Sequence, residues 1–412
     1  MSNRIDTPKI FILTIIICVV SLFISNKEVF SSLKSATAQS KEMFEYFPKN
    51  EGRFSDILLK IFKRNKDENL IIAIDSNRFI GLSKEEDAYF VKDMRSGKKT
   101  IIHKITKKNF LSIAENWDGR YFYWIEGERK KGFLQQSCRW TLYAYDITTN
   151  KKYLIDTCGE GNLPVTRDMK AKSSIMWRDI FGHNGKVVYV KYEKGNNGIV
   201  YQVIKVCDVA TKKYFVVDKV PERENRFIYP PSIYDSNIVW CVSELVSTHS
   251  MATEDGEIYL YNLKTNVKRK ISPNSELVMP RIYKNYVVAL RLPNSIHSQT
   301  QIVLCDISKQ PYKWKIIVYP SLYPTKNNTI FTFADPYISG GYLSWYGNYL
   351  KDGIYIFSLK DLKYYKIPYL KVQKEYSNNI MLYSESPATS LFLRSYEKDN
   401  SLNSYSEYLI LK

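Results

Sequence analysis

Residues 235–272 read DSNIVWCVSELVSTHSMATEDGEIYLYNLKTNVKRKIS, and this stretch decides the fold. It opens with a tight turn, Asp235-Ser236-Asn237, and continues into an apolar run with Trp240 in its middle. After a longer loop come a second apolar run, a short polar turn and the basic run VKRKI. Asn, Asp and Ser favour turns because their side chains bond to nearby backbone groups. β-Branched and aromatic residues favour strands. The stretch therefore predicts three consecutive antiparallel strands joined by one long and one short connection.

The same order of elements recurs along the chain in blocks of roughly 40 to 65 residues, which is the signature of a repeat architecture. An apolar strand precedes each tight turn, and a strand with a central aromatic residue follows it. The predicted tight turns lie at Asp75-Ser76-Asn77, Asp118-Gly119, Asn184-Gly185, Asp235-Ser236-Asn237, Lys284-Asn285, Gly340-Gly341 and Asn378-Asn379. The predicted third-to-fourth-strand turns open on Asp93, Asp146, Asp208, Asn262, Asp306 and Ser358. These acidic and polar residues are interpreted as turn formers rather than as a chemical motif.

One repeat gives a four-stranded antiparallel sheet that cannot bury both of its faces alone. Stacking successive sheets around an axis buries them and leaves only short edges. We therefore predict an all-β fold, a single β-propeller of about seven four-stranded antiparallel blades over residues 53–412. Six blades remain an alternative if the first or last copy is degenerate. The early segment Ser55–Lys63 is expected to supply a missing outer strand to the last blade and close the ring.

An uncharged apolar segment, residues 10–25 (IFILTIIICVVSLFIS), follows Arg4 and Lys9. Basic residues before such a segment place the N-terminus, residues 1–9, in the cytoplasm and the body of the protein outside. Its length lies between a signal-peptide core and a full membrane span. We expect a single-pass anchor in the cell membrane, with a cleaved signal and a secreted body as the alternative. Residues 26–52 are predicted to be a polar tether.

Composition narrows the range of partners. The formal net charge is +18, which favours anionic partners such as acidic polymers or lipid headgroups. The basic residues are scattered in short groups, and no stripe interleaves them with aromatics. Together with the export signal, this argues against nucleic-acid binding. We expect a monomeric propeller attached to the membrane through its N-terminal segment, with an envelope protein or an anionic glycan as its partner.

The string IYLYNLKTNVKRKIS (258–272), with IVWCVSE (238–244) before it, resembles the blade repeat of TolB-like propellers. The same repeat occurs in the propellers of prolyl-oligopeptidase-type peptidases. The resemblance covers the repeats alone and implies a fold, because such propellers serve as binding modules, peptidase gates and occasional enzymes. The peptidases also carry a hydrolase domain with a G-x-S-x-G motif. This sequence contains no G-x-S-x-G, so peptidase activity is not expected.

The cysteines divide into two groups. Cys207 and Cys305 occupy the same position in two repeats and, like Cys241, are interpreted as buried apolar residues. Cys138 and Cys158 flank a predicted hairpin symmetrically about Thr148, which would place them opposite each other. Because the body is expected in an oxidising compartment, we predict a disulfide between them. There is no C-x-x-C pair, and neither a structural metal nor a cofactor is expected.

The candidate binding surface is the face that carries the longest predicted loops, 126–139 and 244–257. Uneven loops on a repetitive scaffold are where recognition residues concentrate. The candidates on this face are Arg129, Lys130, Phe133, Gln135, His249, Glu254, Asp255 and His297. The two histidines, with Glu244, Glu254 or Asp255, offer possible metal ligands. This arrangement is similar to that of oligogalacturonate lyases, but their ligand motif does not match residue by residue. The surroundings of the other two histidines, His103 and His183, give no sign of a binding or catalytic role.

Three functional hypotheses follow. The first is an extracytoplasmic, membrane-anchored propeller that binds a protein or a glycan through its long-loop face and has no catalytic residues. The alternative is a metal-assisted, lyase-like enzyme acting on an anionic polysaccharide. The third is a structural or sensory ectodomain without a stable ligand. Whether the chain is an enzyme is left open, with the non-enzymatic interpretation favoured.

Overall fold

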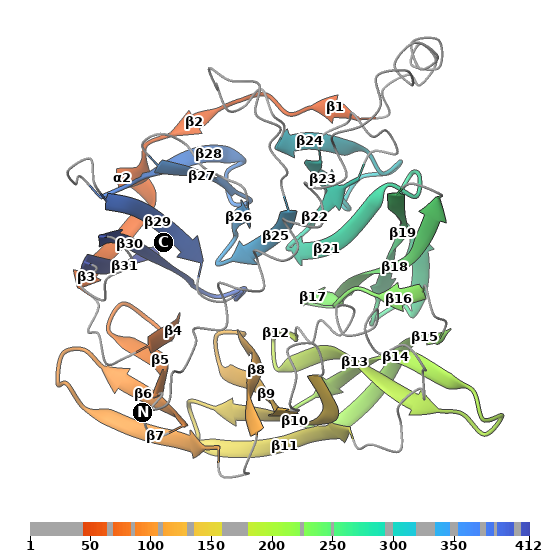
Figure 1. The fold of residues 1–412 in the computed structure, drawn as a ribbon, viewed down its shortest axis with the longest axis horizontal. Helices are drawn as coiled ribbons and strands as arrows, with labels where there is room; N and C mark the ends of the chain where they lie inside the picture. Colours follow the sequence, from red (N-terminus) through yellow and green to blue (C-terminus); the bar gives the residue numbers. More distant parts are fainter. Residues whose placement is uncertain are drawn as a thin grey trace. The chain divides into compact units, whose positions relative to one another are not determined.

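Seven antiparallel sheets stand side by side around one axis in the computed structural model (Figure 1). The model describes the chain from Phe44 onward, and these residues form one unit, Phe44–Lys412. The described ranges are 44–63, 69–83, 87–105, 110–129, 136–158, 180–222, 226–248, 251–292, 300–318, 334–346, 353–370, 376–382, 385–398 and 405–412.

The first four blades follow one another along the chain, each running from an inner strand at the axis to an outer strand at the rim. Blade 1 contains β4 (Asn69–Ala73), β5 (Arg78–Ser83), β6 (Ala88–Asp93) and β7 (Lys99–Lys104). Blade 2 contains β8 (Phe110–Trp117), β9 (Tyr121–Arg129), β10 (Gln136–Asp146) and β11 (Lys151–Cys158). Blade 3 contains β12 (Phe181–His183), β13 (Lys186–Lys194), β14 (Val200–Asp208) and β15 (Lys213–Pro221). Blade 4 contains β16 (Arg226–Ile228) and β17 (Ser232–Tyr234), both paired with β18 (Asn237–Thr248), and then β19 (Met251–Asn262) and β20 (Val267–Lys270).

The last three blades each include a strand from the beginning of the described chain. Blade 5 contains β21 (Leu277–Tyr283), β22 (Tyr286–Arg291), β23 (Gln301–Asp306) and β24 (Trp314–Val318), with β1 (Glu45–Tyr46) added at its rim. Blade 6 contains β25 (Ala334–Ser339), β26 (Tyr342–Tyr346), β27 (Gly353–Ser358) and β28 (Lys363–Pro368), with β2 (Glu51–Gly52) added. Blade 7 contains β29 (Tyr376–Leu382), β30 (Ser390–Lys398) and β31 (Tyr405–Leu411), and its fourth strand is β3 (Leu58–Lys63). The all-β, seven-bladed propeller is therefore confirmed.

Residues 44–63, which we call the strap, run around the outside of blades 5, 6 and 7 (Figure 1). β1 and β2 pair in parallel with β24 and β28, and the short helix α2 (Phe54–Ile57) leads into β3, which pairs antiparallel with β31. The predicted closing strand is thus confirmed. The tether predicted for residues 26–52 is wrong over its last part, because Phe44 is buried and the propeller begins there rather than at 53.

The side-chain chemistry of the turns agrees with the sequence at almost every predicted position. Asp75 and Asp118 accept hydrogen bonds from backbone N–H groups two and three residues on. Asn184 and Asp235 adopt positive φ angles of 50° and 52°, as tight hairpin turns require. In the turns between third and fourth strands, the side-chain oxygen of the first residue accepts a hydrogen bond from a backbone N–H two or three residues on. These first residues are Asp93, Asp146, Asp208, Asn262, Asp306 and Ser358.

The seventh predicted tight turn, at Asn378-Asn379, is wrong. β29 runs straight through these residues and pairs them with Tyr396 and Ser395 of β30. The turn instead follows Glu385, where Ser386 Oγ accepts bonds from the N–H groups of Ala388 and Thr389. A serine in this role is a weaker turn signal than an Asn-Asn pair.

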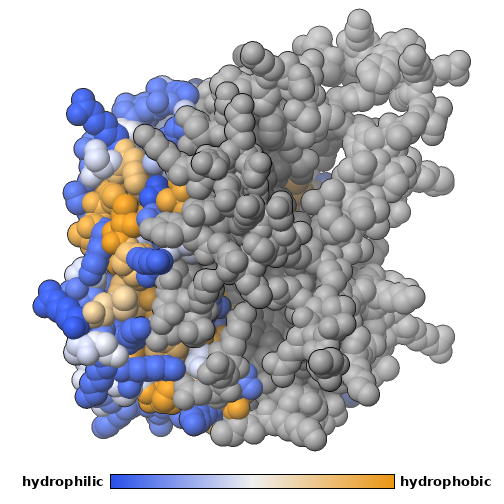
Figure 2. Space-filling view, turned by 60° about the vertical axis from the view of Figure 1, so that its left-hand side comes forward, coloured by the Kyte–Doolittle hydropathy of each residue, from blue (hydrophilic) through white to orange (hydrophobic). Residues whose placement is uncertain are grey.

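Apolar contacts between neighbouring blades form the core. The largest fully buried side chains include Trp117, Trp124 and Trp240 from blades 2 and 4. On the side of the ring turned forward in Figure 2, hydrophobic residues lie between hydrophilic ones on the described surface. None of the helices in the described part of the chain is long and apolar enough to cross a membrane, and the predicted anchor, residues 10–25, lies outside it.

Candidate functional site

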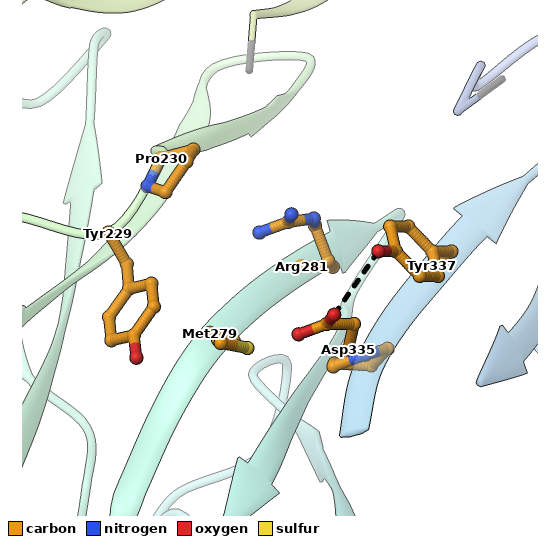
Figure 3. A pocket seen from close by; sticks show the side chains of 7 residues that line it. Tyr229, Pro230, Met279, Arg281, Asp335 and Tyr337 are labelled. Atoms are coloured by element: carbon orange, nitrogen blue, oxygen red, sulfur yellow. Dashed lines mark hydrogen bonds between the residues drawn. The ribbon is translucent and has the colours of Figure 1, made fainter. Parts of the chain in front are cut away.

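A small pocket lies among the inner strands of blades 4, 5 and 6, and we call it the axial pocket (Figure 3). Figure 3 shows Arg281 and Met279 on one strand, facing Asp335 and Tyr337 on the next. The lining residues are Tyr229, Pro230, Met279, Arg281, Asp335, Pro336 and Tyr337.

The three inner strands share a pattern that shapes this pocket. Each contains a proline, one variable residue and an isoleucine shortly before its tight turn: Pro231-Ser232-Ile233, Pro280-Arg281-Ile282 and Pro336-Tyr337-Ile338. Proline has no N–H to give to the sheet, so it interrupts strand pairing. The pairing breaks between β16 and β17 and shifts register at Val278/Arg281 and at Ala334/Pro336. The recurring P-x-I pattern is the signal in the sequence that marks the strands lining the pocket.

Two residues that line the axial pocket have strained backbones. Met279 and Asp335, at equivalent positions in blades 5 and 6, have φ angles of 52° and 44°. Non-glycine residues seldom adopt positive φ, and each instance costs about 1–3 kcal/mol. Such strain persists only where the surrounding structure imposes it, and it concentrates at functional sites.

Arg281 is the fixed charge of the pocket. Its side chain is 7% exposed, and its Nε lies 3.2 Å from both carboxylate oxygens of Glu385. Its guanidinium also donates to the backbone oxygen of Pro280 and stacks on the ring of Phe181 at 4.7 Å. Glu385 Oε1 in turn accepts a bond from the N–H of Ile338 at 2.9 Å. A buried arginine held in this way keeps its guanidinium, and the positive charge on it, in a fixed position.

One end of the axis is closed by residues Glu385–Ser390, which we call the plug. The plug contacts the ends of inner strands in several blades, close to their tight turns. Its bonds are Asn116 Nδ2 to Glu385 O (2.8 Å), Ser386 Oγ to Trp117 O (2.7 Å), Gly340 N to Ser386 O (2.6 Å), Ser339 Oγ to Thr389 O (2.7 Å) and Thr389 Oγ1 to Ala73 O. Met279 and Asp335 lie further from these turns than Arg281 does. The axial pocket is therefore on the long-loop side of the plug.

The lining has the mixed chemistry of a recognition pocket. Arg281 supplies N–H donors, Asp335 supplies carboxylate oxygens, and Tyr337 donates to Asp335 Oδ2 at 3.3 Å. Met279 and the prolines add apolar contact, and a thioether adapts to irregular shapes. A small number of polar groups on an apolar wall is typical of ligand sites. Within the ranges described, no group of three or more His, Cys, Asp or Glu residues is placed to hold a metal ion.

Most of the predicted binding residues lie outside what the structure describes, so their role stays a prediction. This holds for the side chains of Arg129, Lys130, Phe133, Gln135, His249, Glu254 and His297. Asp255 is described, and its carboxylate accepts a 3.4 Å bond from Ser275 Oγ. The interval 244–257 is not an open loop. β18 extends to Thr248 and β19 starts at Met251, which makes a long two-stranded arm.

His103 has a more specific setting than the sequence suggested. Its Nε2 lies 2.5 Å from Oε1 of Glu126, across the boundary between blades 1 and 2, and Glu126 is 3% exposed. Lys152 Nζ lies 3.0 Å from His103 Nδ1. Because a lysine ammonium can only donate, Nδ1 accepts and the ring proton lies on Nε2, facing Glu126. The pair therefore joins two blades.

The register of blade 2 bears on the predicted disulfide. Cys158 is buried and pairs with Trp140, not with Cys138. A register shift between Leu142 and Tyr143 moves the two cysteines out of the symmetric placement expected from the sequence. The side chain of Cys138 lies outside the described residues, so the disulfide itself stays a prediction.

No protein-family model and no curated sequence matches the chain. Similar solved structures include the propeller domain of the Trilobed protease from Pyrococcus furiosus, at 9% identity over 89% of this chain and 93% of that one, with a TM-score of 0.46. An acylaminoacyl peptidase from Pyrococcus horikoshii shows 11% identity over 85% of this chain and 49% of that one, with a TM-score of 0.44. TolB from Acinetobacter baumannii shows 10% identity over 85% and 79%, with a TM-score of 0.34. The seven-bladed ring itself confirms the β-propeller that the repeats predict.

Proposed function

We propose that this chain is a membrane-anchored, extracytoplasmic binding propeller that receives a segment of an envelope protein in the axial pocket. The observation that carries the proposal is the pair of strained residues, Met279 and Asp335, held beside the fixed guanidinium of Arg281. The two positions are equivalent in blades 5 and 6, and positive φ angles at non-glycine residues concentrate at functional sites.

The direction of entry follows from the plug. Because Glu385–Ser390 closes the tight-turn end of the axis, a ligand approaches from the long-loop end. The β18–β19 arm extends from that same end of blade 4, since its hairpin joins the second and third strands. The arm and the pocket thus belong to one binding face.

The lining chemistry favours a polypeptide ligand. A peptide backbone presents both N–H and C=O groups, and the wall of the pocket carries both a carboxylate, that of Asp335, and a guanidinium, that of Arg281. Its side chains match the apolar surface of Met279 and Pro230. An anionic glycan, bound or cleaved, is the second candidate, and the net charge of +18 favours it.

Site-directed photo-crosslinking in intact cells tests the proposal. A photoreactive aromatic amino acid replaces Tyr337 in the full-length protein, and a matched variant carries it at Tyr46, which is 50% exposed on the rim. We expect the Tyr337 position to give one reproducible protein adduct that the Tyr46 position does not give. Adducts that are absent, shared by both positions, or made only with polysaccharide would overturn the protein-binding proposal.

A second variant separates binding from folding. In Asp335→Gly the strained φ becomes acceptable while the carboxylate is lost. We expect the melting temperature to stay level or rise, and capture of the cross-linked partner to fall at least about tenfold. Unchanged capture in a folded Asp335→Gly protein contradicts the assignment of this pocket.

A further inference from the structure

The strap shows how this propeller binds an extended segment at its rim. Glu45 and Tyr46 of β1 pair in parallel with Lys315 and Ile316 of β24, and the N–H of Phe47 donates to Ile316 O at 2.8 Å. Beneath the strap Ile316 is only 2% exposed. The outward N–H and C=O groups of a fourth strand, together with one apolar side chain, therefore form a site for a parallel strand in this fold.

Blade 3 carries the same site without a strand on it. Both β24 and β15 have a bulge at the same register, at Ile317 and Val217. Counting from the bulge, Phe215 and Val216 occupy the positions of Lys315 and Ile316. Within the described chain β15 is the last strand of its sheet. Val216 is 58% exposed and Phe215 44% exposed.

The composition of β15 is unusual for an edge strand. Proteins normally blunt sheet edges with charged residues, prolines or cover, because an open edge recruits other strands. The edge strand of blade 4, β20, follows that rule with Lys268, Arg269 and Lys270. β15 instead presents Tyr214, Phe215 and Val216 in succession, all exposed. Tyr214 is tied to blade 2 through a bond from its hydroxyl to Ile155 O.

We propose that the β15 edge at Phe215–Val216 binds an extended segment of a partner protein, which adds as a parallel strand in the way β1 adds to β24. The segment carries an acidic residue followed by an aromatic or aliphatic one. Two observations point to this chemistry. The strap presents Glu45-Tyr46 at the equivalent site, and the exposed lysines Lys212 and Lys213 precede Phe215. This site is separate from the axial pocket and does not depend on its function.

The decisive variant is Val216→Pro. The carbonyl of Ile316 points outward to the strap, so the N–H and C=O of the equivalent Val216 point away from β14. Proline at this position removes an outward donor and leaves the internal ladder of blade 3 intact, as edge positions allow. Val216→Thr keeps the N–H and is the matched control.

The probe is a fluorescent peptide with the strap sequence MFEYFPK (residues 43–49), titrated into the full-length protein in detergent and compared with a scrambled peptide. We expect saturable binding that Val216→Pro weakens at least about tenfold and Val216→Thr changes less than about twofold. Hydrogen exchange should show new protection over 213–221 and none over 267–270.

Three results overturn the proposal. The first is equal binding of the scrambled peptide, which indicates charge attraction alone. The second is a Val216→Pro protein that keeps its melting temperature and binds the peptide as the wild type does. The third is self-association of the wild-type protein in sedimentation that Val216→Pro abolishes, which assigns the edge to a second copy of the chain.

Discussion

The rim of this propeller is built in two ways, and the difference lies in the strap rather than in the blades. In blades 5 and 6 the strap covers the fourth strands, and Ile316 and Tyr364 are buried to 2% and 0% exposure. In blades 2 and 3 the fourth strands are sheet edges, and Leu154 and Val216 are 59% and 58% exposed. The same structural position is thus buried in the strapped half, blades 5 to 7, and exposed in the unstrapped half, blades 1 to 4.

The halves also differ in what joins their blades. Polar and charged side-chain contacts join the unstrapped blades: His103 to Glu126 between blades 1 and 2, Lys191 and Lys205 to Asp156 between blades 2 and 3, and Lys268 to Asp218 between blades 3 and 4. Among the described residues the strapped side holds the most extensive apolar cluster, to which Phe44 of the strap belongs. The comparison implies that the strapped half depends on burial and the unstrapped half depends more on charge.

Removing the strap has the largest expected effect. A chain that begins at residue 64 lacks the fourth strand of blade 7 and exposes the side of β31 that faces β3. We expect it to lose cooperative unfolding in denaturant, because the ring is then open. The matched control begins at Phe44, the first residue of the propeller unit, and should unfold like the full-length protein. A cooperative transition in the shorter chain would show that the ring does not need closure.

Next in size is a matched pair of phenylalanines. Phe44 is 2% exposed and lies under the guanidinium of Arg291 at 4.1 Å, whereas Phe215 on the unstrapped rim is 44% exposed. We expect Phe44→Ala to lower the free energy of unfolding by about 3 kcal/mol. Phe215→Ala should change it by less than about 0.5 kcal/mol. Urea titration measures both, and similar values for the two variants would remove the distinction between the halves.

As the pH falls, we expect the unstrapped half to lose stability before the strapped half. Burial alone would raise the pKa of Asp156, but hydrogen bonds from Lys191 and Tyr189 outweigh it and lower the pKa below the usual 3.8. Burial likewise opposes the bonds from His103 and Trp124, which lower the pKa of Glu126 below 4.5. A lowered carboxyl pKa gives stability that is present above the unfolded value and is lost as the pH falls through the folded value.

Hydrogen exchange at stepped pH measures this prediction. Below about pH 4 we expect protection of β11 and β13 to fall before that of β23 and β24. Asp156→Asn should reproduce the loss at neutral pH, at a cost of about 1–3 kcal/mol, because it leaves the mostly buried Lys191 without its carboxylate and Lys205 with that of Glu193 alone. Simultaneous loss in both halves would count against the division.

The smallest effect is expected at the surface of the strap itself. Glu45 lies 3.9 Å from Lys315, and both side chains are well exposed, at 71% and 43%. Exposed pairs of this kind contribute about 0–1 kcal/mol. Glu45→Gln should therefore shift the urea midpoint barely at all. A large shift would mean that charge, rather than burial of Phe44 and pairing of β1, holds the strap.

The sequence predicts the ring well and the pocket poorly, for physical reasons. Turns such as Asp118-Gly119 are local, so the residues that form a turn are also the ones that predict it. Arg281 and Glu385 form an ion pair but lie 104 residues apart in the sequence, and no local pattern links them. The sequence does not predict the burial of Phe44, because the residues with which it packs, Arg291 among them, lie far along the chain. The turn predicted at Asn378-Asn379 is wrong for the opposite reason, because strand pairing overrides a strong local preference for a turn.

Ring closure also sets an order of events during synthesis. Leu58 of β3 pairs with Leu411 of β31, so one of the first strands made in the propeller waits for nearly the last. At typical elongation rates of about 5–20 residues per second, that wait lasts roughly 20 to 70 s. During this interval the early strand can bind only to other proteins or to nothing, and contacts this distant in sequence also fold slowly. A nascent chain interrupted before residue 405 has no partner strand for β3, so the edge of this early strand stays open until β31 is made.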